Sequence, residues 1–321
     1  MENEIAIDQL VAEMSERIAA ITVAESENST VPRFNQPKTV AYVDAEFRVH
    51  DDIPEELKQG IFSRPNTYPA KLRFANATSK EDSDKDLRGL SIQLSQVEGF
   101  GPVLWGEQGY QDFILNSHPA LFVATPEEFL EFIRARQQGK VSKALFFLTH
   151  LKSFGIVLKS RKNHLSPLDI RYWSTVPFRL GESGHQVVKY SVIPCSEYET
   201  TEVVNAGKHQ LRAAITAHLK QAPACFHFAV QLQTDPATMP IEDASVVWDE
   251  DVSPFIPVAT IKIEDQEIDN PDILATGERC SFNPWQCLAS HKPLGRMNFV
   301  RQQVYANAAQ LRNKLKNQNK E

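Results

Sequence analysis

Three stretches of the sequence decide the fold: Leu72–Phe74 (LRF), Asp86–Ile92 (DLRGLSI) and Gln111–Phe122 (QDFILNSHPALF). Each overlaps a run rich in β-branched, leucine or aromatic residues, which is typical of a strand. The sequence therefore predicts an antiparallel β-rich core, in the form of a barrel, with helices around it. The predicted strands are Val40–Val49, Ala70–Phe74, Leu90–Leu94, Gln111–Leu115, Gln186–Ile193, Cys225–Gln233 and Phe255–Ile263.

Helical signals occur before, between and after these runs. Apolar residues recur at helical spacing from Ile7 to Ile21, which predicts an amphipathic helix that packs or dimerises. Thr125, followed by a proline and two glutamates, is a good helix start. We expect an N-terminal helical arm over 1–30 and one domain over 31–321. Further helices are predicted at Glu55–Phe62, Pro126–Gln137, Ser142–Leu151, Lys208–Lys220 and Asn298–Lys316.

Composition excludes several classes of protein. The 321 residues are 42% hydrophobic, so the chain can bury a core, and its net charge of −7 argues against binding nucleic acid through phosphate neutralisation. The four cysteines contain no C-x-x-C pair, so neither a zinc ribbon nor a dense disulfide framework is indicated. No apolar run approaches the ~20 residues that span a bilayer. We expect a cytoplasmic protein with no transmembrane segment.

The last predicted helix carries the most informative spacing. Arg301 precedes Tyr305 by one turn, and Arg312 follows seven residues later, so the three lie near one face. A guanidinium one turn before a phenol can hydrogen-bond its oxygen and favour the phenolate, which is a suitable ligand for ferric iron. Taken alone, the same spacing also fits an ordinary solvated helix.

The chain resembles the haem catalase family over about Arg33 to Arg312. The three opening stretches match that family's arginine-phenylalanine strand, its D-x-R-G stretch and its distal strand that ends in N-x-x-P, in the same order. The segment Met297–Tyr305, with Arg312 after it, matches the proximal helix without a gap. The resemblance is to the short catalase-like proteins. It implies an α+β fold with a catalase-like antiparallel barrel of about eight strands, surrounding helices and a C-terminal proximal haem helix.

The resemblance implies roles for individual residues. Tyr305 would be the iron ligand of haem b (iron protoporphyrin IX) and Arg301 the group that keeps it ionised. Asn116 would lie on the distal face of the haem. Burying two propionates is costly unless guanidinium groups pair with them, and the matching residues are Arg33, Arg73 and Arg312. The pocket above the ring would be lined by Leu121 and Phe129.

One position departs from the family pattern. Family members have R-x-x-H at the distal site, whereas this chain reads Arg33-Phe34-Asn35-Gln36. Catalase turnover needs a base that moves a proton between the two peroxide oxygens, and a glutamine amide cannot do so at neutral pH. His50 lies fourteen positions further on, at the far end of the first predicted strand, so we do not expect it to substitute.

We therefore expect a haem-dependent oxidoreductase that uses hydrogen peroxide or an organic hydroperoxide, as a slow peroxidase rather than a fast catalase. Its partners would be a small peroxide or a lipid hydroperoxide, and the resemblance also implies a homo-oligomer. One alternative is a lyase or isomerase of fatty-acid hydroperoxides, like an allene oxide synthase. Two others are a non-catalytic haem carrier or sensor, and an empty barrel that binds another apolar ligand.

Overall fold

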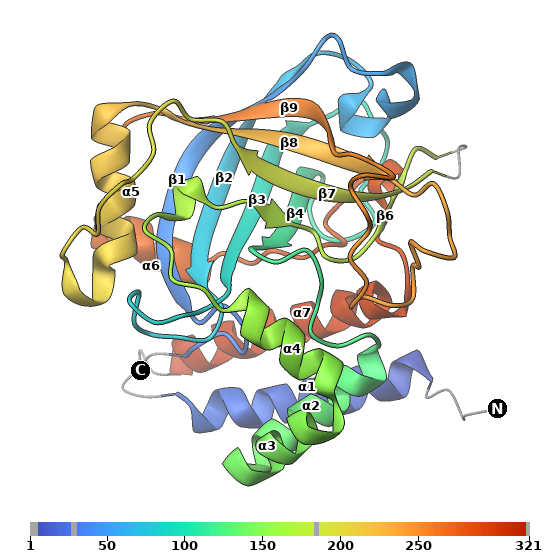
Figure 1. The fold of residues 1–321 in the computed structure, drawn as a ribbon, viewed down its shortest axis with the longest axis vertical. Helices are drawn as coiled ribbons and strands as arrows, with labels where there is room; N and C mark the ends of the chain where they lie inside the picture. The colour runs from blue at the N-terminus through green and yellow to red at the C-terminus, as the bar shows by residue number, and fades with distance from the viewer. Residues whose placement is uncertain (1–5, 27–30, 183–185, 319–321) are drawn as a thin grey trace.

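A closed β-barrel forms the centre of this computed structural model, which describes residues 6–26, 31–182 and 186–318. Figure 1 shows the barrel above a layer of helices that contains α1, α2 and α7. Long strands build most of the barrel wall, and two short ones complete the sheet. The strands are β1 (Lys38–Val49), β2 (Thr67–Asn76), β3 (Arg88–Val97), β4 (Gly109–Asn116), β5 (Tyr172–Trp173), β6 (Phe178–Leu180), β7 (Gln186–Pro194), β8 (Ala224–Leu232) and β9 (Ile256–Ile263).

The short strand β5 closes the barrel. The sheet order is β5-β4-β3-β2-β1-β9-β8-β7-β6, and every pairing is antiparallel. Because Trp173 of β5 pairs with Asn116 of β4 and also with Ser191 of β7, eight strands form a ring, and β6 continues from β5 along the same edge of β7. The predicted antiparallel barrel of about eight strands is therefore confirmed.

Aromatic side chains fill the barrel. The ring centroids of Phe113 and Phe228 are 4.7 Å apart, and those of Phe47 and Phe228 are 5.2 Å apart. Such edge-to-face and tilted contacts add to the burial of large apolar surfaces. On β2 the alternation of exposed and buried residues stops at Leu72, and every residue from there to Asn76 is buried. This end of β2 is therefore covered on both of its faces. Polar side chains that point away from the barrel interior are buried here as well.

The helices cover the lower end of the barrel and one of its sides. They are α1 (Ile7–Ala24), α2 (Pro126–Gln138), α3 (Lys140–Thr149), α4 (Leu151–Ser160), α5 (Gln210–Gln221), α6 (Pro271–Arg279) and α7 (Arg296–Gln318). The predicted cap of α2 is present, since Thr125 Oγ1 accepts a hydrogen bond from Glu128 N at 3.3 Å. Helix α1 packs against α2 and α7 of the same chain. Their shared apolar cluster contains Leu10, Met14, Ile18, Ile21, Leu130, Ile133, Val300 and Val304.

Two predicted helices have a different form. Glu55–Phe62 is two 3-10 turns, because Gln59 is extended and Gly60 has φ +55°. A Cβ on Gly60 would lie 2.3 Å from Nε2 of His291, so this close turn requires glycine. The helix predicted to end at Leu151 breaks one residue earlier, at His150, and α4 follows with a new direction. The ring of His150 stacks on Phe146, which holds the bend.

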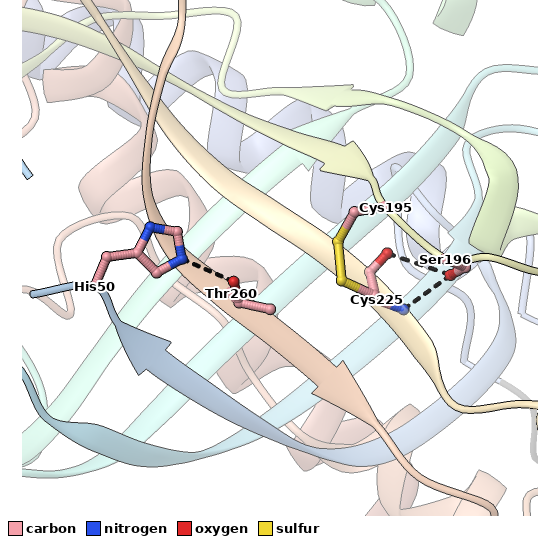
Figure 2. Close-up of a disulfide and its surroundings, with 5 residues drawn as sticks. All are labelled: His50, Cys195, Ser196, Cys225 and Thr260. Carbon is pink, nitrogen blue, oxygen red and sulfur yellow. Dashed lines mark hydrogen bonds between the residues drawn. A yellow bond between two sulfur atoms is a disulfide. The ribbon is translucent and has the colours of Figure 1, made fainter. Parts of the chain in front are cut away.

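One covalent link was not predicted. Cys195, just after β7, forms a disulfide with Cys225 of β8, and the Cα atoms are 5.0 Å apart. Figure 2 shows this disulfide beside Ser196, whose hydroxyl accepts a hydrogen bond from Cys225 N at 2.9 Å. The two cysteines stand next to the paired positions Pro194 and Phe226, so the bond crosses two neighbouring strands. The disulfide therefore links the two ends of the connection between β7 and β8, which contains α5.

Candidate active site

A pair of amides lies where two distant segments meet. Gln36, just before β1, donates a hydrogen bond from Nε2 to Oδ1 of Asn116 at the end of β4, at 3.4 Å. The two residues are 80 positions apart in the chain. The structure thus brings together the two residues that the sequence predicted for the distal side, and we call them the amide pair.

The backbone holds Gln36 in an uncommon conformation. Its φ is +58°, a value that non-glycine residues adopt rarely and that costs on the order of 1 kcal/mol. Gln36 N donates to Ala77 O, and Gln36 O accepts from Arg73 Nη2, both at 3.0 Å. Its side chain lies over Gly89 of β3, where a Cβ would come within 2.2 Å of Gln36 Nε2. The glycine in the D-x-R-G stretch therefore makes room for the amide pair.

Three arginines gather outside the barrel, and we call Arg33, Arg73 and Arg312 the arginine cluster. Arg73 Nε donates to Thr39 Oγ1 at 2.9 Å, and Arg73 Nη2 lies 3.8 Å from a carboxylate oxygen of Glu278. Arg33 Nη2 donates to Cys280 O at 2.6 Å. The side chains of Arg73 and Arg312 are almost fully buried. The cluster draws one residue each from the segment before β1, from β2 and from α7.

The electrostatics of the cluster are unfavourable. Burial, and then repulsion by Arg33, lowers the pKa of Arg73 to about 10. Burial, followed by repulsion from Arg33 and Arg73, lowers the pKa of Arg312 to about 9. Glu278 opposes both shifts, and Arg33 Nε is buried without a hydrogen-bond partner. One carboxylate faces three guanidinium groups, so the cluster can accept further carboxylates.

The tyrosine of α7 has the predicted arginine partner. Arg301 Nη2 donates to the phenol oxygen of Tyr305 at 3.3 Å, and the guanidinium lies 5.2 Å from the ring centroid. Arg301 Nη1 donates to Asn298 Oδ1 at 3.0 Å, while Asn298 Nδ2 donates to the carbonyls of Pro177 and Leu294. A buried asparagine thus fixes the guanidinium against the phenol.

Helix α7 connects this tyrosine to the arginine cluster. Arg312 follows Tyr305 by seven residues, which is two turns or ~10 Å along the axis. The neighbouring Val304 belongs to the apolar cluster shared with α1 and α2. Because the helix is packed along that side, Tyr305 and Arg312 stay in a fixed relation to each other.

Three other residues lie elsewhere or have no contact that joins them to the amide pair. Leu121 donates its backbone N–H to Ala244 O, and Phe129 packs on Phe122 and α2's Phe132, so their predicted place in a pocket stays a prediction. His50 ends β1 at the far side of the barrel from Gln36. Figure 2 shows its Nε2 hydrogen-bonded to the Thr260 hydroxyl of β9, at 2.8 Å. The structure thus places His50 at the opposite end of β1 from Gln36.

Sequence reasoning missed the supporting residues. Glu278, which follows α6's Gly277, also accepts a hydrogen bond from Thr39 N at 2.8 Å and so orients the segment that carries the arginines. Asn298 lies in the segment that matches the proximal helix, but the sequence alone assigns it no role. The signal for it was its position, one turn before Arg301. No pattern in the sequence pointed to Glu278.

The donor set fits the haem that the resemblance implies. The arginine cluster has an excess of buried positive charge and an unpartnered N–H, which suit two propionates. The phenol oxygen of Tyr305, with its arginine partner, suits ferric iron. Within residues 6–26, 31–182 and 186–318 no group of three or more histidine, cysteine or acidic side chains is arranged to hold a metal ion.

Comparisons with known proteins agree with this fold. No family model matches the chain. An allene oxide synthase-lipoxygenase protein from Plexaura homomalla is 21% identical over 255 residues, which are 72% of this chain and 23% of that protein. A fungal catalase and catalase A from Saccharomyces cerevisiae each superpose with a TM-score of 0.69 at 15% identity, over 91% of this chain. A bacterial catalase gives a TM-score of 0.63 at 15% identity, over 97%.

The chain is shorter than all of these proteins. It covers 61%, 63% and 61% of the three catalases, and about a quarter of the Plexaura protein. The catalases show the fold, since the superposition includes almost the whole chain. The chain therefore has the catalase fold, and over 72% of its length it is also similar in sequence to the Plexaura protein.

Proposed function

We propose that this chain is a haem enzyme that transforms organic hydroperoxides and is slow in dismutating hydrogen peroxide. The observation that supports it is the hydrogen bond of the amide pair, which joins Gln36, the residue that the sequence resemblance matches to the distal histidine, to Asn116. Neither side chain titrates near neutral pH. The amide pair would bind and orient a peroxide, but neither amide can relay its proton.

Residues of α7 and the barrel would hold the cofactor. Tyr305 would bind the iron through its phenol oxygen, and Arg301 would orient that oxygen through their hydrogen bond. The arginine cluster would pair with the two propionates, which supply the negative charge that the cluster lacks. When bound, haem supplies a redox-active iron that cleaves the O–O bond.

The amide pair would orient the hydroperoxide. Because Gln36 Nε2 donates to Asn116 Oδ1, the remaining polar atoms are Gln36 Oε1, an acceptor, and Asn116 Nδ2, a donor. A hydroperoxide O–H can donate to the first while its other oxygen accepts from the second. This arrangement would hold the O–O bond in one orientation without removing the hydroperoxide proton. Such binding suits a rearrangement or dehydration of a single substrate molecule. Dismutation instead needs a proton moved within one peroxide and a second peroxide as reductant.

The Plexaura match favours fatty-acid hydroperoxides as the substrate class, because that relative is named for an allene oxide synthase. Within this class, an isomerase or dehydratase needs no electron donor, whereas a peroxidase needs one. The two activities can therefore be separated by omitting the reductant.

The first experiment is an absorption spectrum of the purified chain supplied with hemin, for the wild type and Tyr305→Phe. We expect a high-spin ferric spectrum in the wild type and its loss in the variant. Tyr198→Phe is the matched control, since that ring packs on His218 in the connection that contains α5. If the wild type retains no haem, the proposal fails.

The second experiment measures turnover. A polyunsaturated fatty-acid hydroperoxide should be consumed without added reductant, and hydrogen peroxide should release oxygen slowly. Gln36→His should raise oxygen release about 100-fold, the usual gain from a positioned proton-transfer group. Rapid oxygen release by the wild type, unchanged in Gln36→His, would refute the role of the amide pair. Haem binding with no consumption of either peroxide would indicate a carrier or sensor instead.

A further inference from the structure

An uncovered apolar surface lies on the bent helix pair α3–α4. Three large side chains on each helix are exposed, at spacings that place them on one face. Val141 is 77% exposed, Leu148 68% and Leu151 70%, which are high values for residues of this size and polarity. We call this surface the α3–α4 face, and it consists of Val141, Leu145, Leu148, Leu151, Phe154 and Leu158.

The opposite side of the pair is anchored to the protein. Phe146 and Phe147 pack against Phe132 of α2, with centroid distances of 5.6 and 5.9 Å. Figure 1 shows α3 at the end of the molecule opposite β8 and β9. The helices are therefore fixed by their inner side, while the outer apolar stripe meets solvent. Contiguous apolar patches of this kind mark interaction sites.

The segment that carries the α3–α4 face has basic residues and no acidic ones, although Glu131 and Asp243 of other segments lie close to His150 and Lys152. Segment 140–162 contains six basic residues and no aspartate or glutamate, in a chain whose net charge is −7. Lys152 lies 3.6 Å from Asp243, and Arg161 Nε donates to Lys85 O, so part of this charge is engaged. The six basic residues are Lys140, Lys143, Lys152, Lys159, Arg161 and Lys162.

This combination points to one kind of partner. Within the described residues no single helix is long and apolar enough to cross a membrane, and α3 with α4 reaches that composition only as a pair bent by 108°. Apolar stripes with basic residues beside them bind at the surface of anionic membranes. A second copy of the chain would present the same positive charge and be repelled. We infer that the α3–α4 face docks this protein on an anionic lipid bilayer, with the helices lying in the interface.

Vesicle flotation of the full chain tests this inference without using enzyme activity. Phosphatidylcholine vesicles with and without 30% phosphatidylglycerol serve as the probe, at 0.1 M salt. We expect the wild type to float with the anionic vesicles and to be released at 1 M salt, where charges are screened within about 3 Å. Failure to float with anionic vesicles would overturn the inference.

Two double variants separate the apolar and the ionic contributions. Leu148→Glu/Leu151→Glu should lower the partition coefficient at least tenfold. Lys140→Glu/Lys159→Glu should lower it about 30-fold, since each cation near an anionic surface contributes about a fivefold factor. All four side chains are exposed, so both proteins should fold normally.

Matched controls come from segments outside α3 and α4. Val203→Glu/Val252→Glu changes two similarly exposed apolar residues, and Lys220→Glu reverses an exposed charge on α5. These should bind vesicles as the wild type does, and an equal loss in the controls would overturn the inference. So would a wild-type dimer that Leu148→Glu/Leu151→Glu dissociates without any vesicle binding, because the face would then serve a second copy.

Discussion

Replacing Arg312 with leucine should stabilise the protein prepared without haem and weaken its affinity for haem. Arg312 is 7% exposed and lies with Arg33 and Arg73, which repel it. Leucine removes the buried charge and keeps an apolar side chain at this buried position. When two propionates neutralise the cluster, the same substitution removes one of their partners. The sign of the effect therefore depends on whether haem is bound.

The magnitude follows from the pKa of Arg312. It falls from an ordinary value of 12.5 to about 9, so the folded state disfavours the cation. At about 1.4 kcal/mol per pKa unit, this shift sets an upper bound of about 5 kcal/mol on the free energy by which the Arg312 cation destabilises the folded state. That destabilisation is fully present below pH ~9 and becomes smaller above it. Exchanges of buried charges for apolar residues yield about 1–4 kcal/mol. We expect about 2 kcal/mol, or a rise in Tm of roughly 4 °C.

The assay compares thermal and urea unfolding of the wild type and Arg312→Leu, with and without haem. Haem should stabilise the wild type by more than it stabilises the variant, and titration should show a haem affinity at least tenfold lower. Arg134→Leu is the control, since that exposed arginine pairs with Glu13 at 2.6 Å and should lose stability slightly in both forms. A haem-free Arg312→Leu protein that is less stable than the wild type would refute the reasoning.

Three further predictions concern single side chains. Gly89→Ala places a Cβ 2.2 Å from Gln36 Nε2 and should lower hydroperoxide turnover about tenfold with an unchanged haem spectrum; equal turnover would contradict the role of the glycine. Arg301→Leu removes the hydrogen bond to Tyr305 and should weaken haem binding about tenfold, measured by hemin titration. Burial lowers the pKa of Lys189 to about 7, so below that pH the folded protein holds a buried cation that destabilises it. Lys189→Met should therefore raise the urea midpoint most below pH 7 and progressively less toward pH 10, because the folded wild type then contains the neutral amine.

Most of the barrel could be predicted from local patterns. The strands β1–β4 and β7–β9 have runs of β-branched and aromatic residues, and their observed bounds differ from the predicted ones by a few residues. Strands β5 and β6 contain two and three residues, so no periodicity can develop in them. Yet β5 closes the barrel, and its place depends on pairing with Asn116 and Ser191. Barrel closure depends on the pairing of strands that are distant in sequence, so a local sequence pattern does not predict it.

The site was predictable where one element holds both partners. Arg301 and Tyr305 share a helix, so their spacing alone predicts the hydrogen bond that the structure shows. The amide pair required the family resemblance, because 80 residues separate its members. Glu278 was not predicted, since its role depends on α6 packing against β1. The disulfide was also missed, because its cysteines meet only through the register of β7 and β8.

The net charge of the chain excludes some partners but does not show where its cations lie. A value of −7 argues against a phosphate-neutralising surface, but it averages over cations that the fold sorts into two places. The arginine cluster includes Arg312 of α7, and burial together with repulsion from Arg33 and Arg73 lowers the pKa of Arg312, which would favour an anionic ligand there. The lysines of segment 140–162 instead lie around an exposed apolar stripe, where screening is strong and a large, diffuse anionic surface is the better match. Under the two proposals, basic residues would serve opposite purposes, since the buried arginines would bind a small anionic ligand and the exposed lysines an anionic membrane.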